Sequence, residues 1–352
     1  MHSSSRITGI FTRPISLSRK KVFRMPSMTS NRVRPLSLDD LGIELKTEDH
    51  AAAMETATFD PLPPEDPTLV EVKAAIALGF AGVILSGPPG TGKSWYAKRI
   101  AQTLSGNPDN VRIVQFHASY QYEDFMEGFM PKDGGGFELH KKVFPLLCDD
   151  AAELPDETFV LVIDEISRCD VARVFGEALT YMEVDKRGLP CTMASGSMLV
   201  VPANLIILAT MNPWDKGVDE MDVALERRFA QIDMPPSVAA LRKILQGNGA
   251  DGAFVDLVAT FFDGVLKIEE EAVHLGHAYF NNCLDETSAR RVWDYRLLPF
   301  FRKACRLDRE LLQRIRRMWL NVVPEALQQI PVQGPPDHGI ADQPAVQADQ
   351  AG

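Results

Sequence analysis

One eight-residue segment constrains the fold of this 352-residue chain more than any other. It reads Gly-Pro-Pro-Gly-Thr-Gly-Lys-Ser over residues 87–94, directly after an apolar run at 83–85, and a helical pattern begins at Lys93. A glycine-rich turn between a strand and a helix directs successive backbone N–H groups inward, where they bind phosphate oxygens beside the positive helix end. The segment therefore predicts nucleotide binding, with Lys93 at the β- and γ-phosphates and the Ser94 hydroxyl on Mg²⁺. The candidate nucleotide-binding residues are Gly87, Pro88, Pro89, Gly90, Thr91, Gly92, Lys93 and Ser94.

Short β-rich segments alternate with longer helical patterns around this loop, which indicates an α/β fold with a parallel sheet and crossover helices. The predicted strands are 83–85, 111–116, 159–163, 205–210 and 230–234, and the predicted helices are 93–104, 143–154 and 171–183. A hairpin is predicted at 191–202, with its turn at Ser195-Gly196. After Pro235-Pro236 only helical patterns follow. We therefore predict an α/β nucleotide-binding domain over 61–235 and a small all-helical domain over 236–323.

The two ends of the chain differ in composition from its middle. Residues 1–38 carry eight basic side chains and no acidic one, which fits an organellar transit peptide, a disordered basic arm or an over-extended reading frame. We predict disorder over 1–60, and also over 324–352, which is rich in Pro, Gly, Gln, Asp and Ala.

Composition narrows the function classes. The net charge of −11 argues against nucleic-acid binding by the whole chain, and no apolar run near the motifs is long enough to span a membrane. The five cysteines are scattered without metal-binding spacing, so we expect reduced thiols and a cytoplasmic location.

Two acidic residues, Asp164 and Glu165, directly follow the third predicted strand. The continuous apolar run at 159–163 is typical of a strand buried on both faces of a parallel sheet. At its end Asp164 would reach Mg²⁺ and Glu165 would polarise an attacking water. Nucleotide binding alone needs only the aspartate, so the pair indicates hydrolysis. The alternative is that Glu165 is a solvated residue at the start of a helix.

Two further motifs lie downstream. Asn212 follows the buried strand 205–210 and is a candidate to orient water against the γ-phosphate, the alternative being an Asn-Pro turn. Arg227 and Arg228 precede the last strand, and an arginine here could enter a neighbouring subunit's site and stabilise the transferring phosphoryl group. Arg228 is the first candidate and Arg227 the second. The alternative is that both arginines pair with surface carboxylates.

Taken together, these four motifs in this order, followed by helices, resemble the AAA+ ring ATPases over roughly residues 66–323, with 87–94 as Walker A and 159–165 as Walker B. Shorter segments are similar to the McrB-type branch, the NTPase subunit of modification-dependent restriction systems, which is related to the dynein-related and MoxR-like proteins. These segments are 114–128, 174–178, 183–188, 276–280 and 293–299.

The resemblance implies a parallel five-stranded core with a helical lid, a hexameric ring, Mg²⁺-dependent hydrolysis of ATP or GTP, and a protein partner such as a nuclease-bridging subunit. It also implies a lid arginine that touches the nucleotide, for which Arg290, Arg291 and Arg296 are the candidates. Helical spacing places Arg290 and Arg291 on different faces, so at most one of these two points inward.

Two departures from the family limit what the resemblance implies. Family members that restrict DNA carry an N-terminal DNA-reading domain, whereas fewer than 90 residues precede the loop here, so direct DNA binding by this chain is not expected. Residues 211–217 read Met-Asn-Pro-Trp-Asp-Lys-Gly where the family has Met-Asn-Thr-Ala-Asp-Arg-Ser, which favours ATP, with GTP as the alternative.

The leading hypothesis is a McrB-like motor or remodelling subunit. The alternatives are a MoxR-like chaperone that matures a protein client, and a nucleotide-dependent scaffold with little turnover.

Overall fold

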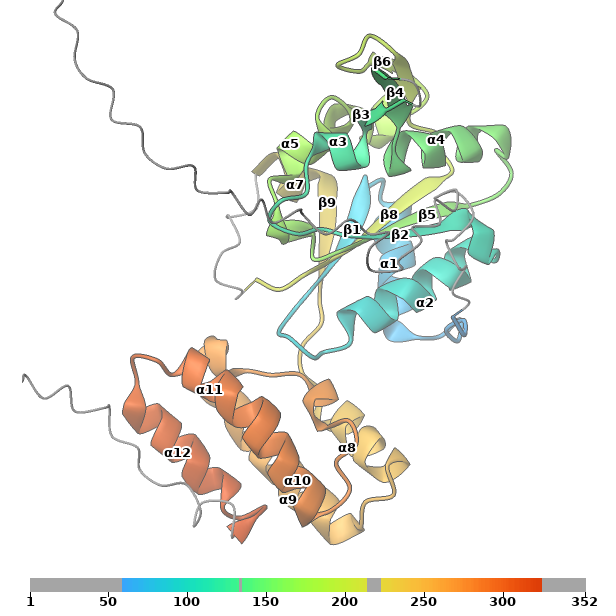
Figure 1. Ribbon diagram of the computed structural model, residues 1–352. Helices are drawn as coiled ribbons and strands as arrows, with labels where there is room; N and C mark the ends of the chain where they lie inside the picture. The colour runs from blue at the N-terminus through green and yellow to red at the C-terminus, as the bar shows by residue number, and fades with distance from the viewer. Residues whose placement is uncertain (1–58, 133–134, 214–222, 325–352) are drawn as a thin grey trace, which may run out of the picture. The chain divides into compact units, whose positions relative to one another are not determined.

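The computed structural model describes residues 59–132, 135–213 and 223–324 (Figure 1). The predicted transit or arm segment, 1–38, and nearly all of the two segments predicted to be disordered, 1–60 and 324–352, lie outside these ranges. Residues 214–217 of the segment compared with the family pattern, which include Asp215, also lie outside them.

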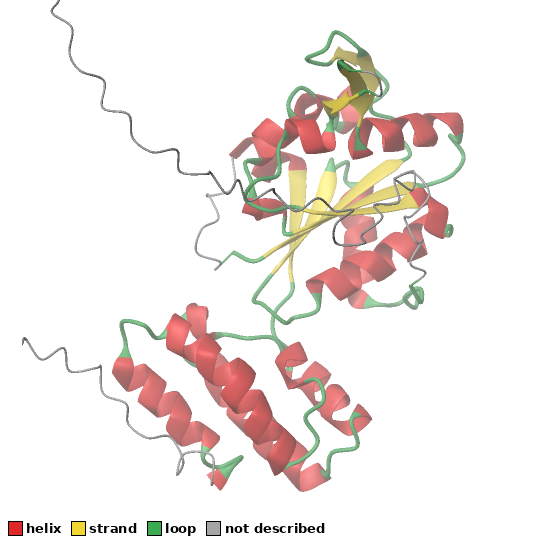
Figure 2. Ribbon diagram, in the orientation of Figure 1, coloured by secondary structure: helices red, strands yellow, loops and turns green. Residues whose placement is uncertain are grey.

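A five-stranded parallel sheet forms the centre of the α/β part of the chain (Figures 1 and 2). Its strands are β1 (Gly82–Ser86), β2 (Val111–Gln115), β5 (Phe159–Asp164), β8 (Leu205–Met211) and β9 (Phe229–Asp233). They lie in the order β2-β5-β8-β1-β9, and every pairing is parallel. Each predicted strand is confirmed to within one residue at either end. The carboxyl ends of the strands therefore meet at one edge of the sheet.

Helices cover both faces of this sheet, which explains why its strands are apolar without interruption. Successive side chains of a strand point to opposite faces. Val83 and Leu85 of β1 pack with α1 (Pro67–Ala77) and α2 (Lys93–Ser105), whereas Ile84 packs in the core that contains α4 (Val143–Glu153) and α5 (Val171–Phe175). Figure 1 shows α1 and α2 on one side of the sheet and α4 and α5 on the other.

One predicted helix is wrong in its extent. The sequence predicts a continuous helix over 171–183, but the chain forms α5 and then a separate short helix, α6 (Ala178–Tyr181). The break lies at Gly176, which has φ 50°. A Cβ there would lie 2.8 Å from the ring of Tyr122, a residue of α3 (Tyr122–Phe125). The helix therefore ends where a distant aromatic side chain packs against its backbone.

Two antiparallel hairpins project from the same side of the sheet as α4 (Figure 2). The first pairs β3 (Glu127–Pro131) with β4 (Phe137–Lys141), and the second pairs β6 (Pro190–Thr192) with β7 (Met198–Val200). The second confirms the hairpin predicted at 191–202, and its turn includes Gly196 with φ 89°. The Glu127 carboxylate accepts hydrogen bonds from the backbone N–H of Ser195 at 2.8 Å and from its hydroxyl at 2.7 Å. This carboxylate joins the two hairpins.

The C-terminal region is helical, as predicted. Its helices are α8 (Val238–Gly247), α9 (Gly252–Leu266), α10 (Glu286–Val292), a π-helical turn (Trp293–Leu297), α11 (Leu298–Ala304) and α12 (Arg309–Trp319). Its core contains Trp293 stacked on Trp319, with ring centroids 5.0 Å apart, and Phe261 edge-on to Trp319. Within the described ranges, no helix combines the length and apolar character needed to cross a membrane.

Candidate functional site

The glycines of the 87–94 segment have the backbone geometry that its predicted phosphate-binding role requires. The segment joins β1 to α2, and Gly90 and Gly92 have φ values of 82° and 90°, a region that side-chain-bearing residues rarely adopt. At Gly87, a Cβ would collide with the carbonyl oxygen of Met234 at the end of β9. These three positions therefore exclude larger residues for reasons of conformation or space.

Lys93 folds back over this loop. Its ammonium donates to the carbonyl oxygens of Gly87 at 2.8 Å and Pro88 at 2.9 Å, and the residue is buried. Burial lowers the pKa of Lys93, while the nearby carboxylates of Glu165 and Asp164 act in the opposite direction. The loop thus holds a cation at the place where the sequence predicts β- and γ-phosphates.

Ser94 and Asp164, the two residues predicted to bind Mg²⁺, lie next to each other in the fold. The Ser94 hydroxyl, at the start of α2, donates to Asp164 Oδ1 at the end of β5 over 2.7 Å. Mg²⁺ prefers hard oxygen ligands and usually binds through one or two protein oxygens together with phosphate oxygens and water. A hydroxyl and a carboxylate within hydrogen-bonding distance fit that donor set.

Thr210 links the two acidic residues to the neighbouring strand. The backbone N–H of Glu165 donates to Thr210 Oγ1 at 3.0 Å, and that hydroxyl donates in turn to Asp164 Oδ1. Glu165 adopts φ 59°, an uncommon conformation for a residue with a side chain and one that is found preferentially at functional sites. Thr210 was not among the site residues predicted from the sequence. The signal available was a hydroxyl residue near the end of an otherwise apolar strand.

Glu165 and Asn212, two of the candidate catalytic residues, line the same pocket. The pocket has a volume of about 260 Å³. The α/β part contributes Pro89, Glu165, Arg168 and Asn212, and the helical region contributes Glu271, Ala272, His274, Tyr279, Phe300, Lys303 and Ala304. Arg168 Nε lies 3.4 Å from Glu165 Oε2, so a guanidinium group accompanies the candidate general base.

The helical region also contacts the phosphate loop through its backbone. The N–H groups of Gly276 and Ala278 donate to the carbonyl oxygens of Pro89 at 2.8 Å and Gly90 at 2.9 Å. A Cβ on Gly276 would collide with the backbone of Gly90. Two backbone hydrogen bonds and a close approach therefore connect the segment 276–280 to the loop.

The three candidate lid arginines lie elsewhere. None of Arg290, Arg291 and Arg296 belongs to the lining of the Glu165 pocket as described, whereas Lys303 does. Arg296 instead donates to the backbone carbonyl of Tyr279 at 3.3 Å. The nucleotide-sensing role of an arginine stays a prediction. Lys303 was missed because helical spacing alone does not show which basic residue of this region faces the loop.

Arg227 and Arg228 lie at the opposite edge of the sheet from the loop. Arg228 ends α7 (Val223–Arg228), and its carbonyl oxygen accepts from the N–H of Ala81 at 2.8 Å, just before β1. The five residues of β1 separate Ala81 from Gly87, the first residue of the loop. A strand rises about 3.3 Å per residue, so the two edges are roughly 16 Å apart. The arginines are therefore remote from the phosphate loop of their own chain.

Comparison with known proteins agrees with this arrangement. Residues 82–229 match the family described as AAA domain, dynein-related subfamily. The chain is 35% identical over 266 residues to the EcoKMcrB subunit of a type IV methyl-directed restriction enzyme from Escherichia coli K12. The chain belongs to the McrB-type AAA+ proteins. It is also 28% identical over 188 residues to component YdiS of the type II restriction enzyme BsuMI from Bacillus subtilis 168.

The matched regions leave part of these proteins uncovered. The first alignment covers 70% of this chain and 57% of the Escherichia coli protein, and the second covers 42% and 55%. The chain thus spans little more than half the length of either relative.

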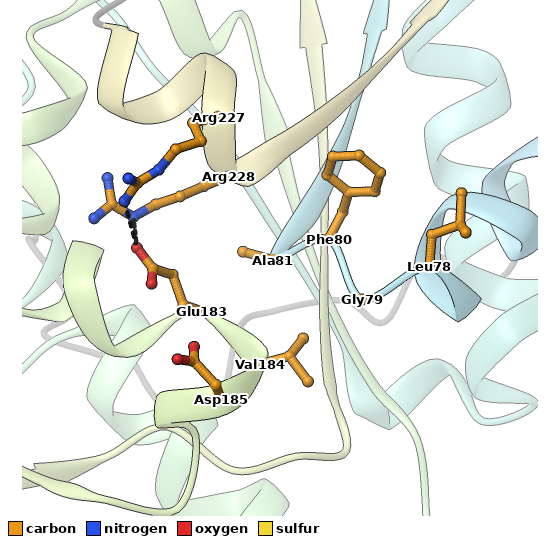
Figure 3. Close-up of a pocket in the computed structure, with 9 residues that line it drawn as sticks. All are labelled: Leu78, Gly79, Phe80, Ala81, Glu183, Val184, Asp185, Arg227 and Arg228. Carbon is orange, nitrogen blue, oxygen red and sulfur yellow. Dashed lines mark hydrogen bonds and ion pairs between the residues drawn. The ribbon is translucent and has the colours of Figure 1, made fainter.

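In this AAA+ protein both arginines pair with one carboxylate (Figure 3). Glu183 Oε1 lies 2.7 Å from Arg228 Nε and 3.2 Å from an Arg227 terminal nitrogen. The single chain therefore shows the carboxylate pairing that the sequence analysis raised as the alternative. The Arg228 side chain is only 10% exposed, whereas that of Arg227 is 72% exposed. Exposure favours Arg227 for contact with another molecule, the reverse of the order that the sequence suggested.

Proposed function

We propose that this AAA+ protein is a Mg²⁺-dependent nucleoside triphosphatase that works as a ring-forming motor or remodelling subunit, with ATP as the favoured substrate and GTP as the alternative. The observation that carries the proposal is the hydrogen-bonded series from Ser94 through Asp164 and Thr210 to Glu165. This series joins the metal-ligand pair to the candidate general base, directly beside the glycine-rich loop.

In the proposed reaction, the loop N–H groups and the Lys93 ammonium bind and orient the phosphates. Bound Mg²⁺, held by Ser94 and Asp164, would neutralise phosphate charge. Glu165 accepts a proton from the attacking water, and Asn212 holds that water in line with the γ-phosphorus. The bond from the γ-phosphorus to the bridging oxygen breaks, and the nucleoside diphosphate and inorganic phosphate leave. Glu165 and Asn212 are suited to these roles because they line the same pocket.

The phosphate loop and the two arginines lie at opposite ends of the sheet strands, which supports a catalytic site formed by residues of two copies of the chain. Since the arginines lie roughly 16 Å from the loop of their own chain, an arginine contact with the γ-phosphate needs a second copy. We propose that copies assemble head to tail into a ring, with six members by analogy with the family. Hydrolysis per subunit should then rise with protein concentration as sites are completed.

The experiment that tests this function is steady-state hydrolysis of ATP and GTP at rising protein concentration, with E165Q as the inactive control. We expect specific activity to increase with concentration for the wild type and to fall by at least about a hundredfold in E165Q. Specific activity that is independent of concentration would overturn the shared site. Tight nucleotide binding without turnover in the wild type would instead support the scaffold alternative.

The partner is proposed from the relatives. Both are named as parts of restriction enzymes, so we propose a protein partner of the nuclease-bridging kind for this chain, with DNA contacts made by the partner, and a cytoplasmic location. Co-purification of the tagged protein from its native cells, followed by mass spectrometry, tests this. Recovery of a nuclease-bearing protein would support the restriction role, and recovery of a non-nuclease client alone would support the MoxR-like alternative.

A further inference from the structure

Three cations share the carboxylate of Glu183. This residue precedes the 3₁₀ turn Val184–Lys186, and its Oε2 lies 2.6 Å from Lys186 Nζ. Its Oε1 lies within ion-pair distance of both Arg228 and Arg227, and Figure 3 shows the three side chains converging. The hydrogen bond from Lys186 is the largest influence lowering the pKa of Glu183, and the two arginines add to it. The carboxylate is therefore ionised at neutral pH.

The two arginines differ in how this carboxylate holds them. Arg228 contacts it through Nε, close to the backbone end of the guanidinium, and its side chain is almost covered. Arg227 contacts it through one terminal nitrogen, and most of its side chain is in solvent. A guanidinium has five N–H donors in a planar fork, so one contact at 3.2 Å leaves Arg227 donors able to reach a phosphate. Arg228 is therefore held in place by the carboxylate, whereas Arg227 is free to extend toward another molecule.

The surface beside the pair is hollow. A pocket of about 470 Å³ is lined by Glu183, Asp185, Arg227 and Arg228 together with apolar side chains of the segment before β1. Among these, Leu78 is 79% exposed and Val184 of the 3₁₀ turn is 52% exposed. Arg227 thus lies next to open space rather than under neighbouring side chains.

We infer that Glu183 is a positioning residue for catalysis in trans: it holds Arg228 as an anchor and keeps Arg227 directed outward, toward the triphosphate bound by a second copy of the chain. The inference rests on the function proposed above. Two adjacent guanidinium groups repel one another, and a long arginine side chain has many rotamers. A carboxylate between them offsets the repulsion and restricts the rotamers before the neighbour arrives, which is a form of pre-organisation.

The test uses E183Q, which keeps the shape of the side chain but removes its charge, with D185N from the same pocket as the matched control. We expect E183Q to bind a fluorescent ATP analogue with wild-type affinity, because its own phosphate loop is untouched. Its kcat should fall about tenfold to a hundredfold, the range expected for a misplaced catalytic group. D185N should keep wild-type kcat, and R227A should lose at least as much kcat as E183Q.

Mixing variants distinguishes a role in trans from a merely structural one. E165Q subunits carry an inactive site but intact arginines, so adding them in excess to E183Q should raise the activity above that of either variant alone. No gain on mixing, in variants that assemble like the wild type by sedimentation, would overturn the inference, as would wild-type kcat in E183Q. If E183Q assembles poorly, E183D, which keeps the charge on a shorter side chain, is tested in the same mixture with the same criteria. A wild type that does not hydrolyse nucleotide would refute the proposed function itself.

Discussion

The backbone N–H of Glu165 donates to the Thr210 hydroxyl at 3.0 Å and so ties the end of β5 to the end of β8. The same hydroxyl donates to Asp164. Thr210 is buried at 1% exposure, so neither bond competes strongly with water. The left-handed backbone of Glu165 is therefore held by a residue that belongs to a different strand.

Replacing Thr210 should affect hydrolysis more than nucleotide binding. T210V keeps the shape of the side chain but removes the hydroxyl, which takes the acceptor away from the Glu165 N–H and releases the carboxylate of Asp164. We expect kcat to fall by about tenfold or more, with the nucleotide Kd within about twofold of wild type. T210S retains the hydroxyl and should recover most of the activity. Equal kcat values for T210V and wild type would contradict the assigned role.

Nucleotide affinity should weaken at alkaline pH. Burial lowers the pKa of Lys93 below the ordinary 10.5, so in the nucleotide-free protein the charge is lost at a lower pH than in an unfolded chain. The phosphates then lose a cationic partner, and Kd should begin to rise at a pH below 10.5. A fluorescence titration of nucleotide binding across alkaline pH measures this. K93R, which stays charged throughout, should flatten the profile, and an unchanged slope in K93R would assign the pH effect elsewhere.

A methyl group at Gly276 should separate the helical region from the phosphate loop. The substitution G276A would collide with the Gly90 backbone and disrupt the hydrogen bond to Pro89. We expect nucleotide affinity to fall by about tenfold, because the loop loses a backbone contact worth about 1 kcal/mol and is displaced. Isothermal titration with a non-hydrolysable nucleotide checks this. Gly252, where a Cβ meets nothing within 4 Å, supplies the control G252A, which should bind as the wild type does.

Arg187 should contribute strongly to stability. Its guanidinium donates to the backbone carbonyls of Ala81 at 2.9 Å and Met182 at 3.0 Å, and also to that of Leu205. Replacing it by methionine would leave these carbonyls without the donor, and Ala81 and Leu205 are buried. R187M should lower the free energy of unfolding by about 2–4 kcal/mol in urea titrations. The exposed Arg173 provides the control R173M, for which a change within about 0.5 kcal/mol is expected.

Local patterns were sufficient to predict most of the fold. The strands were predictable because burial on both faces makes them continuously apolar. The phosphate loop was predictable because its backbone conformation requires glycine at particular positions. The position of Asn212 followed from its place at the end of β8. These features are encoded within a few consecutive residues.

The rest depends on contacts between residues far apart in the chain. The helix predicted over 171–183 breaks at Gly176 because Tyr122, more than 50 residues earlier, packs against it. The pairing of Glu183 with Arg227 and Arg228 joins positions more than 40 residues apart. Neither contact leaves a periodic signal in the sequence, and side-chain exposure, which distinguishes the two arginines, exists only in the folded protein.

The placement of the phosphate loop and the arginines at opposite edges of the sheet has a numerical consequence for an assembly that shares sites in the proposed way. In an open row of copies, the phosphate loop of the subunit at one end is reached by no neighbour's arginines. The row therefore has one complete catalytic centre fewer than it has subunits. Closing the row into a circle completes the last centre without adding a subunit. Conversely, removing one subunit from a closed circle removes two complete catalytic centres: the centre at its own phosphate loop and the neighbouring centre that its arginines completed.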